Sequence, residues 1–189
     1  MRKLIVFNLI TVDGFYAGLD GDISWHNVDD EFQEFAIEQT KTFATHVYGR
    51  VTYEIMANYW PAANARETDP IVANLMNTTP KVVFSKTLKA VKESEYWKNI
   101  TLYHELTPEI ILDLKKERGG DIAILGSGTI VQQLTNWCLI DEYRLLVNPL
   151  ILGKGKAMFA NIQNRVDFTL INTRIFKNGN VLLYYVPKH

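Results

Sequence analysis

The sequence predicts one α/β domain with a mixed central sheet and helices on both faces. Short apolar, β-branched runs alternate along the chain with segments whose apolar residues recur at helical spacing, the order expected of strands connected by helices. Two strand-like runs at the end of the chain are joined at Asn178-Gly179, a dipeptide typical of tight hairpins, so the sheet cannot be purely parallel. Neither a repeat nor a linker interrupts the pattern, which predicts a single domain over residues 1–189.

The composition excludes several classes of protein. The 189 residues are 47% hydrophobic and 22% charged, as in an ordinary globular domain. Twenty basic and twenty-one acidic residues leave a net charge of −1, so we expect no nucleic-acid partner. Cys138 is the single cysteine and cannot form an internal disulfide, and the four histidines are too far apart in the sequence for a zinc motif. We therefore expect no metal site.

The first residues resemble the start of a secretory signal, because Arg2 and Lys3 precede an apolar run. Asn8 interrupts that run, Asp13 ends it, and no small-residue cleavage site follows, so a first buried strand is the better interpretation. No later segment has the roughly 20 apolar residues of a membrane helix. A lone cysteine suits a reducing compartment, so we expect a cytoplasmic protein with no membrane partner.

The pattern predicts the following elements in the first half of the chain. They are a strand over 3–12, a glycine-rich loop from Asp13-Gly14 to Trp25, a helix from Asp29 to about Thr42, a strand over 46–48, a helix from 52 to near Trp60-Pro61, and a surface connection over 61–79 with a short helix at 71–76.

The second half continues the alternation. We expect strands over 81–84 and 100–103, a helix capped by Thr107 and ended by Gly119-Gly120, a strand over 122–125, a tight turn at 126–128, a helix from 130 to about 138, and strands over 142–147, 167–176 and 181–186.

Three places where a strand meets a helix or loop suit phosphate groups. Gly126-Ser127-Gly128-Thr129 could hold a pyrophosphate on bare backbone N–H groups, or could be a plain tight connection. Gly49-Arg50-Val51-Thr52 adds a guanidinium and a hydroxyl, the alternative being an N-cap by Thr52 and a solvated Arg50. Ser85-Lys86 ends a third strand and could simply run into solvent. Because carboxyl ends of parallel strands meet at one edge, we expect all three to converge on one elongated nucleotide.

Asp30 has two interpretations. It could contact or protonate a nitrogen heterocycle, or it could be an ordinary first-turn acid spaced from Gln33 like a capping box. Trp25 could likewise be a ligand platform or a core residue. Lys154 and Lys156, among glycines, are expected in a solvated loop.

Seven short motifs follow one another in a familiar order. They are Asp13 to Ala17, Gly21 to Trp25, Gly49 to Glu54, Val83 to Leu88, Gly126 to Thr129, Ile140 to Glu142, and Pro149 through Gly153, Gly155 and Phe159. Together they resemble the dihydrofolate reductase-like superfamily, and most closely stand-alone relatives of the reductase C-terminal domain of the bifunctional riboflavin-biosynthesis deaminase-reductase. The resemblance spans nearly the whole chain and implies a three-layer fold, an NADPH cofactor and a homodimer.

The resemblance also implies roles for particular residues. Gly126, Ser127, Gly128 and Thr129 would hold the pyrophosphate and nicotinamide side, Gly49, Arg50 and Thr52 the phosphates, Arg50 with Ser85 and Lys86 the adenosine 2′-phosphate, and Ile10, Thr11 and Gly14 the nicotinamide. Asp30 would be the catalytic proton or hydrogen-bond partner, because it stands five residues after Trp25 as the pterin-binding carboxylate does in dihydrofolate reductases. Asp30 and Trp25 would both contact the substrate.

The implied activity is hydride transfer from NADPH to a pyrimidine- or pteridine-type substrate. Thr78-Thr79-Pro80 stands where a dihydrofolate reductase has the arginine that grips the folate tail, so folate is disfavoured. Asp13-Gly14 and Gly153-x-Gly155 point to the riboflavin branch, and so to a 5-amino-6-(5-phosphoribosylamino)uracil reductase. The alternatives are dihydrofolate reductase activity and a nucleotide-binding protein without turnover.

Overall fold

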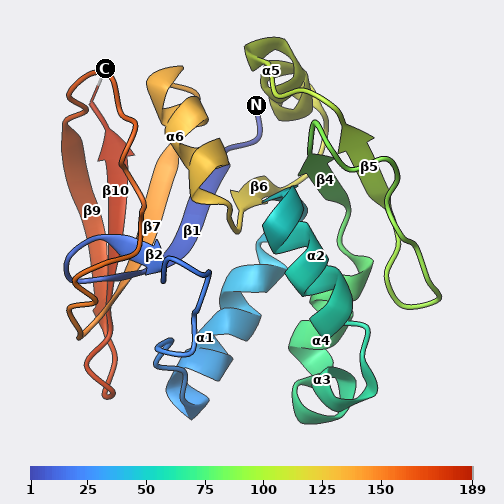
Figure 1. Cartoon of the computed structure of the whole chain (residues 1–189), viewed down its shortest axis with the longest axis horizontal. Helices are drawn as coiled ribbons and strands as arrows, with labels where there is room; N and C mark the ends of the chain where they lie inside the picture. The colour runs from blue at the N-terminus through green and yellow to red at the C-terminus, as the bar shows by residue number, and fades with distance from the viewer. Residues whose placement is uncertain (189) are drawn as a thin grey trace.

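The computed structural model describes residues 1–188, and its centre is an eight-stranded mixed sheet (Figure 1). The strands of this sheet are β1 Leu4–Thr11, β3 Phe43–Gly49, β4 Lys81–Phe84, β5 Ile100–Tyr103, β6 Asp121–Ile124, β7 Glu142–Asn148, β9 Phe168–Ile175 and β10 Val181–Pro187. They lie in the order β5-β4-β3-β6-β1-β7-β10-β9. A separate pair, β2 Phe15–Ala17 and β8 Lys156–Ala157, is antiparallel.

The predicted mixture of parallel and antiparallel strands is confirmed. The strand β1 is parallel to both neighbours, with Val6 opposite Ile124 of β6 and Tyr143 of β7. The strand β10 is antiparallel to both β7 and β9. In the turn before β10, Gly179 has a φ of +89° and its N–H donates to the Phe176 carbonyl at 3.0 Å.

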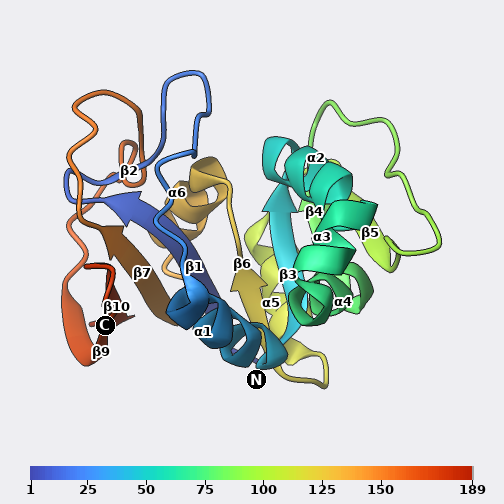
Figure 2. The same ribbon diagram turned by 90° about the horizontal axis from the view of Figure 1, so that it is seen from below.

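Helices cover both faces of the sheet, as expected (Figures 1 and 2). They are α1 Asp30–Lys41, α2 Arg50–Tyr59, α3 Ala63–Thr68, α4 Pro70–Thr78, α5 Pro108–Lys116 and α6 Gly128–Asn136. Alternation along β1 sends Leu4 and Val6 into a core with residues of α5 and α6, whereas Phe7 and Leu9 pack with Phe32 of α1 on the other face. Residues of α2 and α4 pack with Val83 of β4 on that second face. The result is a three-layer fold.

The expectation for residues 61–79 was correct only in part. The short helix expected at 71–76 is confirmed as α4, but α3 was not predicted, and Val72, Ala73 and Met76 of α4 are buried, so the segment is not a surface connection. Pro70 suits the first turn of α4, because its missing N–H would have no partner there. The pair β2 and β8 was not predicted either.

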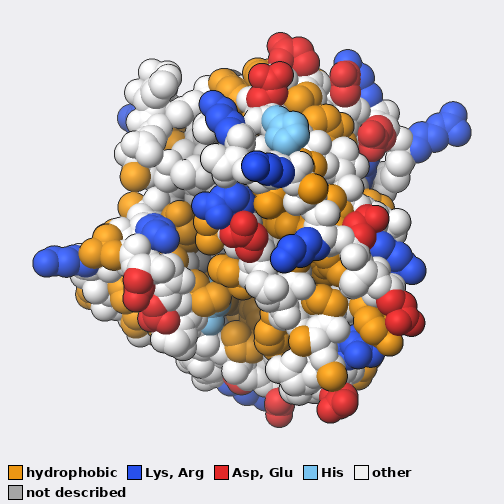
Figure 3. Space-filling model, turned by 45° about the vertical axis from the view of Figure 1, so that its right-hand side comes forward, with side chains coloured by type: hydrophobic (Ala, Val, Ile, Leu, Met, Phe, Trp, Pro, Cys, Tyr) orange, Lys and Arg blue, Asp and Glu red, His pale blue; other side chains and the backbone are white. Residues whose placement is uncertain are grey.

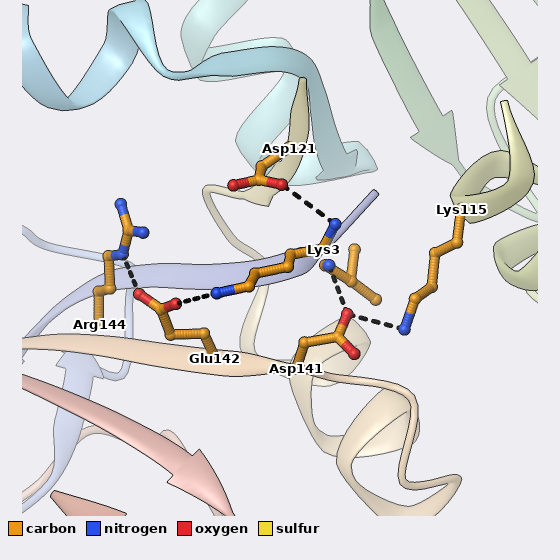
Figure 4. A network of polar contacts seen from close by, with 7 residues as sticks. Lys3, Lys115, Asp121, Asp141, Glu142 and Arg144 are labelled. Atoms are coloured by element: carbon orange, nitrogen blue, oxygen red, sulfur yellow. Dashed lines mark hydrogen bonds and ion pairs between the residues drawn. The ribbon is translucent and has the colours of Figure 1, made fainter. Parts of the chain in front are cut away.

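A polar network fixes the amino end of β1 (Figure 4). The Lys3 N–H donates to Asp121 at 3.1 Å, and the Leu4 N–H donates to Asp141 at 2.7 Å. The Lys115 ammonium lies 2.7 Å from the same Asp141 oxygen. These contacts hold the start of β1 between its neighbours, so its carboxyl end lies at the opposite end of the sheet, where the parallel strands finish.

Within residues 1–188, no helix is long and apolar enough to cross a membrane.

Candidate cofactor and substrate cleft

The chain turns in opposite directions where it leaves β3 and β6. After β3 the chain passes through α2 toward β4, which lies on one side of the β3–β6 pair in the sheet. After β6 it passes through α6 toward β7, which lies on the other side of that pair. Because β3 and β6 are neighbours, their carboxyl ends flank a topological switch point, the usual ligand site of open α/β sheets. A cleft of about 1270 Å³ opens there.

The cleft has two halves with different lining. One half is lined by the carboxyl ends of β3, β4 and β6 and the first turns of α2 and α6; we call it the strand-end half. The other is lined by β1, α1, α4 and the end of α2; we call it the α1-side half. Figure 3 shows a hollow in this face of the molecule with hydrophobic side chains in its wall.

The two predicted glycine turns touch each other at the strand-end half. The Gly49 N–H donates to the Gly126 carbonyl at 3.4 Å, and a Cβ on Gly49 would lie 2.6 Å from Ser127 Oγ. Gly126 has a φ of +119°, and a Cβ there would lie 2.9 Å from Thr52 Oγ1. The first turns of α2 and α6 can therefore approach this closely only because both positions are glycine.

The N-termini of α2 and α6 are free of side-chain caps. By contrast, Asp29 caps α1 through the Phe32 N–H at 2.9 Å, and Thr107 caps α5. Gly49 has no side chain to offer, and the Ser127 hydroxyl instead bonds to that of Thr129 at 2.8 Å. Thr52 does not cap α2, so that part of the alternative is wrong, whereas Arg50 is solvent-exposed as the alternative expected. Two sets of backbone N–H groups with positive helix dipoles thus face the cleft, a suitable arrangement for phosphates.

Three cations line the cleft. Arg50 is exposed and lies 3.0 Å from Glu54, its neighbour one helical turn on. Lys86 is exposed after β4. Lys156 of β8 also lines the cleft, although the sequence suggested only a solvated loop. Ser85 is buried, and its hydroxyl accepts the Leu88 N–H at 2.9 Å, so this side chain shapes the turn that presents Lys86.

Four predicted cofactor residues do not line the cleft, but they support it. Ile10 lies in the core, Thr11 donates to the Asp13 carboxylate at 2.5 Å, and Gly14 accepts the Met158 N–H at 2.9 Å. A Cβ on Gly128 would lie 2.3 Å from the ring of Tyr16. Tyr16, which these residues hold against α6, is the side chain that reaches the cleft.

Asp30 and Trp25 are not brought to the cleft. Asp30 is exposed on the first turn of α1 and does not belong to the lining. The capping residue is Asp29, whose carbonyl also accepts the Gln33 N–H at 2.9 Å. Asp30 is therefore an ordinary first-turn acid, as one interpretation expected, but it does not form a capping box with Gln33. Trp25 packs at 4.6 Å against the ring of His26, and His26 is the one that lines the cleft.

Several lining residues escaped the sequence analysis. Asn8 and Gln39 are 8% and 5% exposed, and Asn8 Oδ1 and Gln39 Nε2 have no hydrogen-bond partner among the described residues. His26 Nε2 is likewise unpartnered within residues 1–188. Burial lowers the pKa of His26 to about 4, so its ring is neutral at pH 7. The available signal was Asn8, a polar residue inside an otherwise apolar strand.

Comparison with known proteins agrees with this geometry. Residues 2–182 match the family described as the RibD C-terminal domain. The chain belongs to this family. Two Bacillus subtilis (strain 168) proteins match along almost their whole length: Uncharacterized protein YyaP is 30% identical over 186 residues, covering 97% of this chain and 94% of YyaP, and Uncharacterized protein YwjB is 26% identical over 190 residues, covering 98% of each.

Solved structures show the same fold at low sequence identity. A putative riboflavin biosynthesis protein from Shewanella sp. PV-4 superposes with a TM-score of 0.74, 23% identity and full coverage of both chains. The Thermotoga maritima diaminohydroxyphosphoribosylaminopyrimidine deaminase/5-amino-6-(5-phosphoribosylamino)uracil reductase superposes with a TM-score of 0.69 and 15% identity. The match covers 99% of this chain and 57% of that one. Dihydrofolate reductase from Enterococcus faecalis, complexed with NADP(H) and RAB-propyl, superposes with a TM-score of 0.64 and 18% identity, covering 99% of this chain and 97% of that one. The dihydrofolate reductase-like fold of this RibD C-terminal domain is thereby confirmed.

Proposed function

We propose that this RibD C-terminal domain protein is an NADPH-dependent reductase that acts on a pyrimidine- or pteridine-type ring compound. The observation that carries the proposal is the meeting of two uncapped helix N-termini, those of α2 and α6, across the contact between Gly49 and Gly126. Such a pair of N-termini suits the two phosphates of a dinucleotide. Family membership and the reductases among the structural neighbours support the same reaction class.

The residues of the strand-end half fit this cofactor. Backbone N–H groups after Gly49 and Ser127 would hold the pyrophosphate, and the glycines leave room where a Cβ would obstruct the approach. Arg50 and Lys86 would select the adenosine 2′-phosphate by charge. When bound, NADPH supplies a hydride from C4 of its dihydronicotinamide ring. Tyr16 would then form the wall that keeps water from that ring.

The substrate would occupy the α1-side half. Hydride addition to a C=N or C=O carbon requires a proton on the adjoining nitrogen or oxygen. No carboxylate of α1 lines the cleft, so we assign the proton to water that enters from solvent, in place of Asp30. The substrate implied by the resemblance, 5-amino-6-(5-phosphoribosylamino)uracil, carries a phosphate and would need a cation near its ribose.

The proposal is tested by titrating the protein with NADPH and NADH while following tryptophan fluorescence. We expect saturable binding that prefers NADPH. Arg50→Ala and Lys86→Ala should each lower the affinity for NADPH about tenfold, since one charge-assisted contact contributes on the order of 1.4 kcal/mol. Neither substitution should change the affinity for NADH. Lys89→Ala, an exposed lysine outside the cleft, is the control. Absence of binding by both nucleotides would overturn the reductase assignment.

A further inference from the structure

The α1-side half of the cleft is almost without charge. Its walls carry aromatic and aliphatic side chains, among them Phe32, Tyr59 and Trp60. Of the described residues that line this half, only Asp69 is an Asp, Glu, Lys or Arg, and it is acidic. Arg50 and Lys86 both belong to the strand-end half.

The third cation, Lys156, comes from β8, which is not among the elements that line the α1-side half. It lies on β8, and a Cβ on Gly21 would be 3.4 Å from its ammonium, so Lys156 stands beside the loop that follows β2. The adjoining Ala157 carbonyl accepts from Gln132 of α6 at 3.1 Å. The backbone after Lys156 therefore lies against α6, and its ammonium reaches the cleft beside the loop that leads from β2 to α1.

Neutral amides supply the hydrogen bonding that this half offers. Gln33 and Gln39 lie on α1 and line the cleft, and Gln39 Nε2 is buried without a partner in the part of the chain that the structure describes. Asn8 also lines the cleft, and its Oδ1 is unpartnered among the described residues, but its side chain is on the opposite face of β1 from Phe7 and Leu9 and so points away from α1. Buried amide groups without partners are costly, so a ligand that pairs with them gains affinity.

The aromatic side chains favour a flat ligand. Tyr59 and Trp60 pack edge to face, with ring centroids 4.9 Å apart, and both line the cleft. Phe32 lines the opposite wall, on α1. Aromatic walls of this kind stack on planar rings.

We infer that the substrate is an uncharged planar ring compound with amide-like edges and without a phosphate group. The inference rests on the proposed function, because it assumes that NADPH fills the strand-end half. A phosphate in the α1-side half would lose its water, meet no cation from the elements that line this half and be repelled by Asp69. Carbonyl and N–H edges of a neutral ring would instead satisfy Gln33 and Gln39.

Matched ligand pairs test the inference. The protein, saturated with NADP⁺ to block the phosphate sites of the strand-end half, is titrated calorimetrically with riboflavin and FMN, and with uridine and UMP. Each pair differs only in the phosphate. We expect the unphosphorylated member of at least one pair to bind, and to bind at least tenfold more tightly than its phosphate ester. Tighter or equal binding of the phosphate ester would overturn the inference, as would failure of all four compounds to bind. Failure of NADP⁺ itself to bind would instead overturn the proposed function, so the two failures are distinguishable.

Two variants of α1 sharpen the test. Gln39→Leu should weaken the unphosphorylated ligand about tenfold without affecting NADPH. Gln33→Arg places a cation in the α1-side half and should raise the affinity for FMN relative to riboflavin at least tenfold. Asn64→Arg makes the same charge change on exposed α3, outside the cleft, and should leave the ratio unchanged. If the wild-type protein binds FMN more tightly than riboflavin and the Lys156→Ala variant does not, Lys156 is the phosphate site and the inference is wrong.

Discussion

At the scale of single residues, two glycines with positive φ form a matched pair. Gly126 has a φ of +119° and an added Cβ would meet Thr52, whereas Gly153 has a φ of +76° and nothing within 4 Å. Alanine at either position should cost about 1 kcal/mol of stability through backbone strain. Only Gly126→Ala should also lower the affinity for NADPH, at least tenfold, because the added Cβ would push apart the first turns of α2 and α6. Urea denaturation and NADPH titration of both variants check this, and equal NADPH affinities would contradict it.

His46 predicts a dependence of stability on pH. It is fully buried, its ring lies 3.3 Å from the Tyr48 hydroxyl, and it pairs in register with Lys81. Burial first, and the nearby Lys81 charge second, lower its pKa to about 3. As the pH falls below about 6.5, His46 binds a proton in the unfolded chain but not in the folded protein, where protonation requires a pH near 3. The free energy of unfolding therefore falls as the pH drops from about 6.5 toward 3.

The expected size of this effect follows from the lowered pKa. Between pH 7 and pH 5, His46 should remove about 2 kcal/mol from the free energy of unfolding, at roughly 1.4 kcal/mol per pH unit below 6.5. His46→Gln should reduce the pH-dependent loss by that amount, measured by urea denaturation at both pH values. His104→Gln, at an exposed histidine, should not. The same loss in wild type and His46→Gln would refute the assignment.

The residue scale is also where prediction from sequence was weakest. The chain offers two adjacent acids, Asp29 and Asp30, and either can begin a helix. The spacing of Phe32 and Phe35 fixes which face of the helix is buried, but it is compatible with either acid as the cap. In the structure Asp29 is the cap, Gln33 lines the cleft and Asp30 is exposed. Periodicity alone cannot show where the helix begins.

At the scale of elements, local patterns located every strand of the large sheet. Inner strands such as β4 and β6 are buried apolar runs that are easily seen, whereas the exposed strand β9 was located through the Asn178-Gly179 hairpin that joins it to β10. The pair β2 and β8 could not be found this way. The two strands are three and two residues long and about 140 residues apart in the chain, and their pairing depends on tertiary contact. The converging glycine turns, by contrast, were predictable, since each follows a recognisable strand.

Asp13 joins the two loops that carry β2 and β8. Its carboxylate accepts N–H groups of Leu152 at 3.1 Å and Gly153 at 2.8 Å. The Thr11 hydroxyl, followed by these backbone groups, lowers the pKa of Asp13, so the carboxylate remains ionised in neutral solution. Asp13→Ala should release residues 12–25 and 150–157 from each other.

The measurement is hydrogen exchange together with NADPH titration. We expect faster exchange in both segments and several-fold weaker NADPH binding, because Tyr16 would lose its fixed position against α6. Asp113→Ala, at an exposed acid on α5, is the control. Unchanged exchange in residues 150–157 would show that Asp13 does not join the loops.

At the scale of the whole molecule, β9 is an edge strand with an apolar exposed side. Leu170, Ile171 and Ile175 are 49%, 52% and 75% exposed. Long apolar edges are usually covered, so we expect the homodimer implied by the family resemblance to use this strand. Light scattering should give twice the chain mass for the wild type and a monomer for Ile175→Lys. Ile71→Lys, at an exposed position on α4, should remain dimeric. A monomeric wild type would contradict the prediction.

The central position of β1 affects how the protein is made. Leu4 pairs with Ile122 of β6, about 120 residues later in the chain. The other neighbour of β1 is β7, which is synthesised later still. At about 5–20 residues per second, a ribosome needs many seconds to supply those partners. During that time an apolar, β-branched segment has emerged with neither neighbour, which invites pairing between nascent chains. Yield during expression should therefore depend on chaperones and improve at lower temperature, even though the finished sheet encloses this segment on both sides.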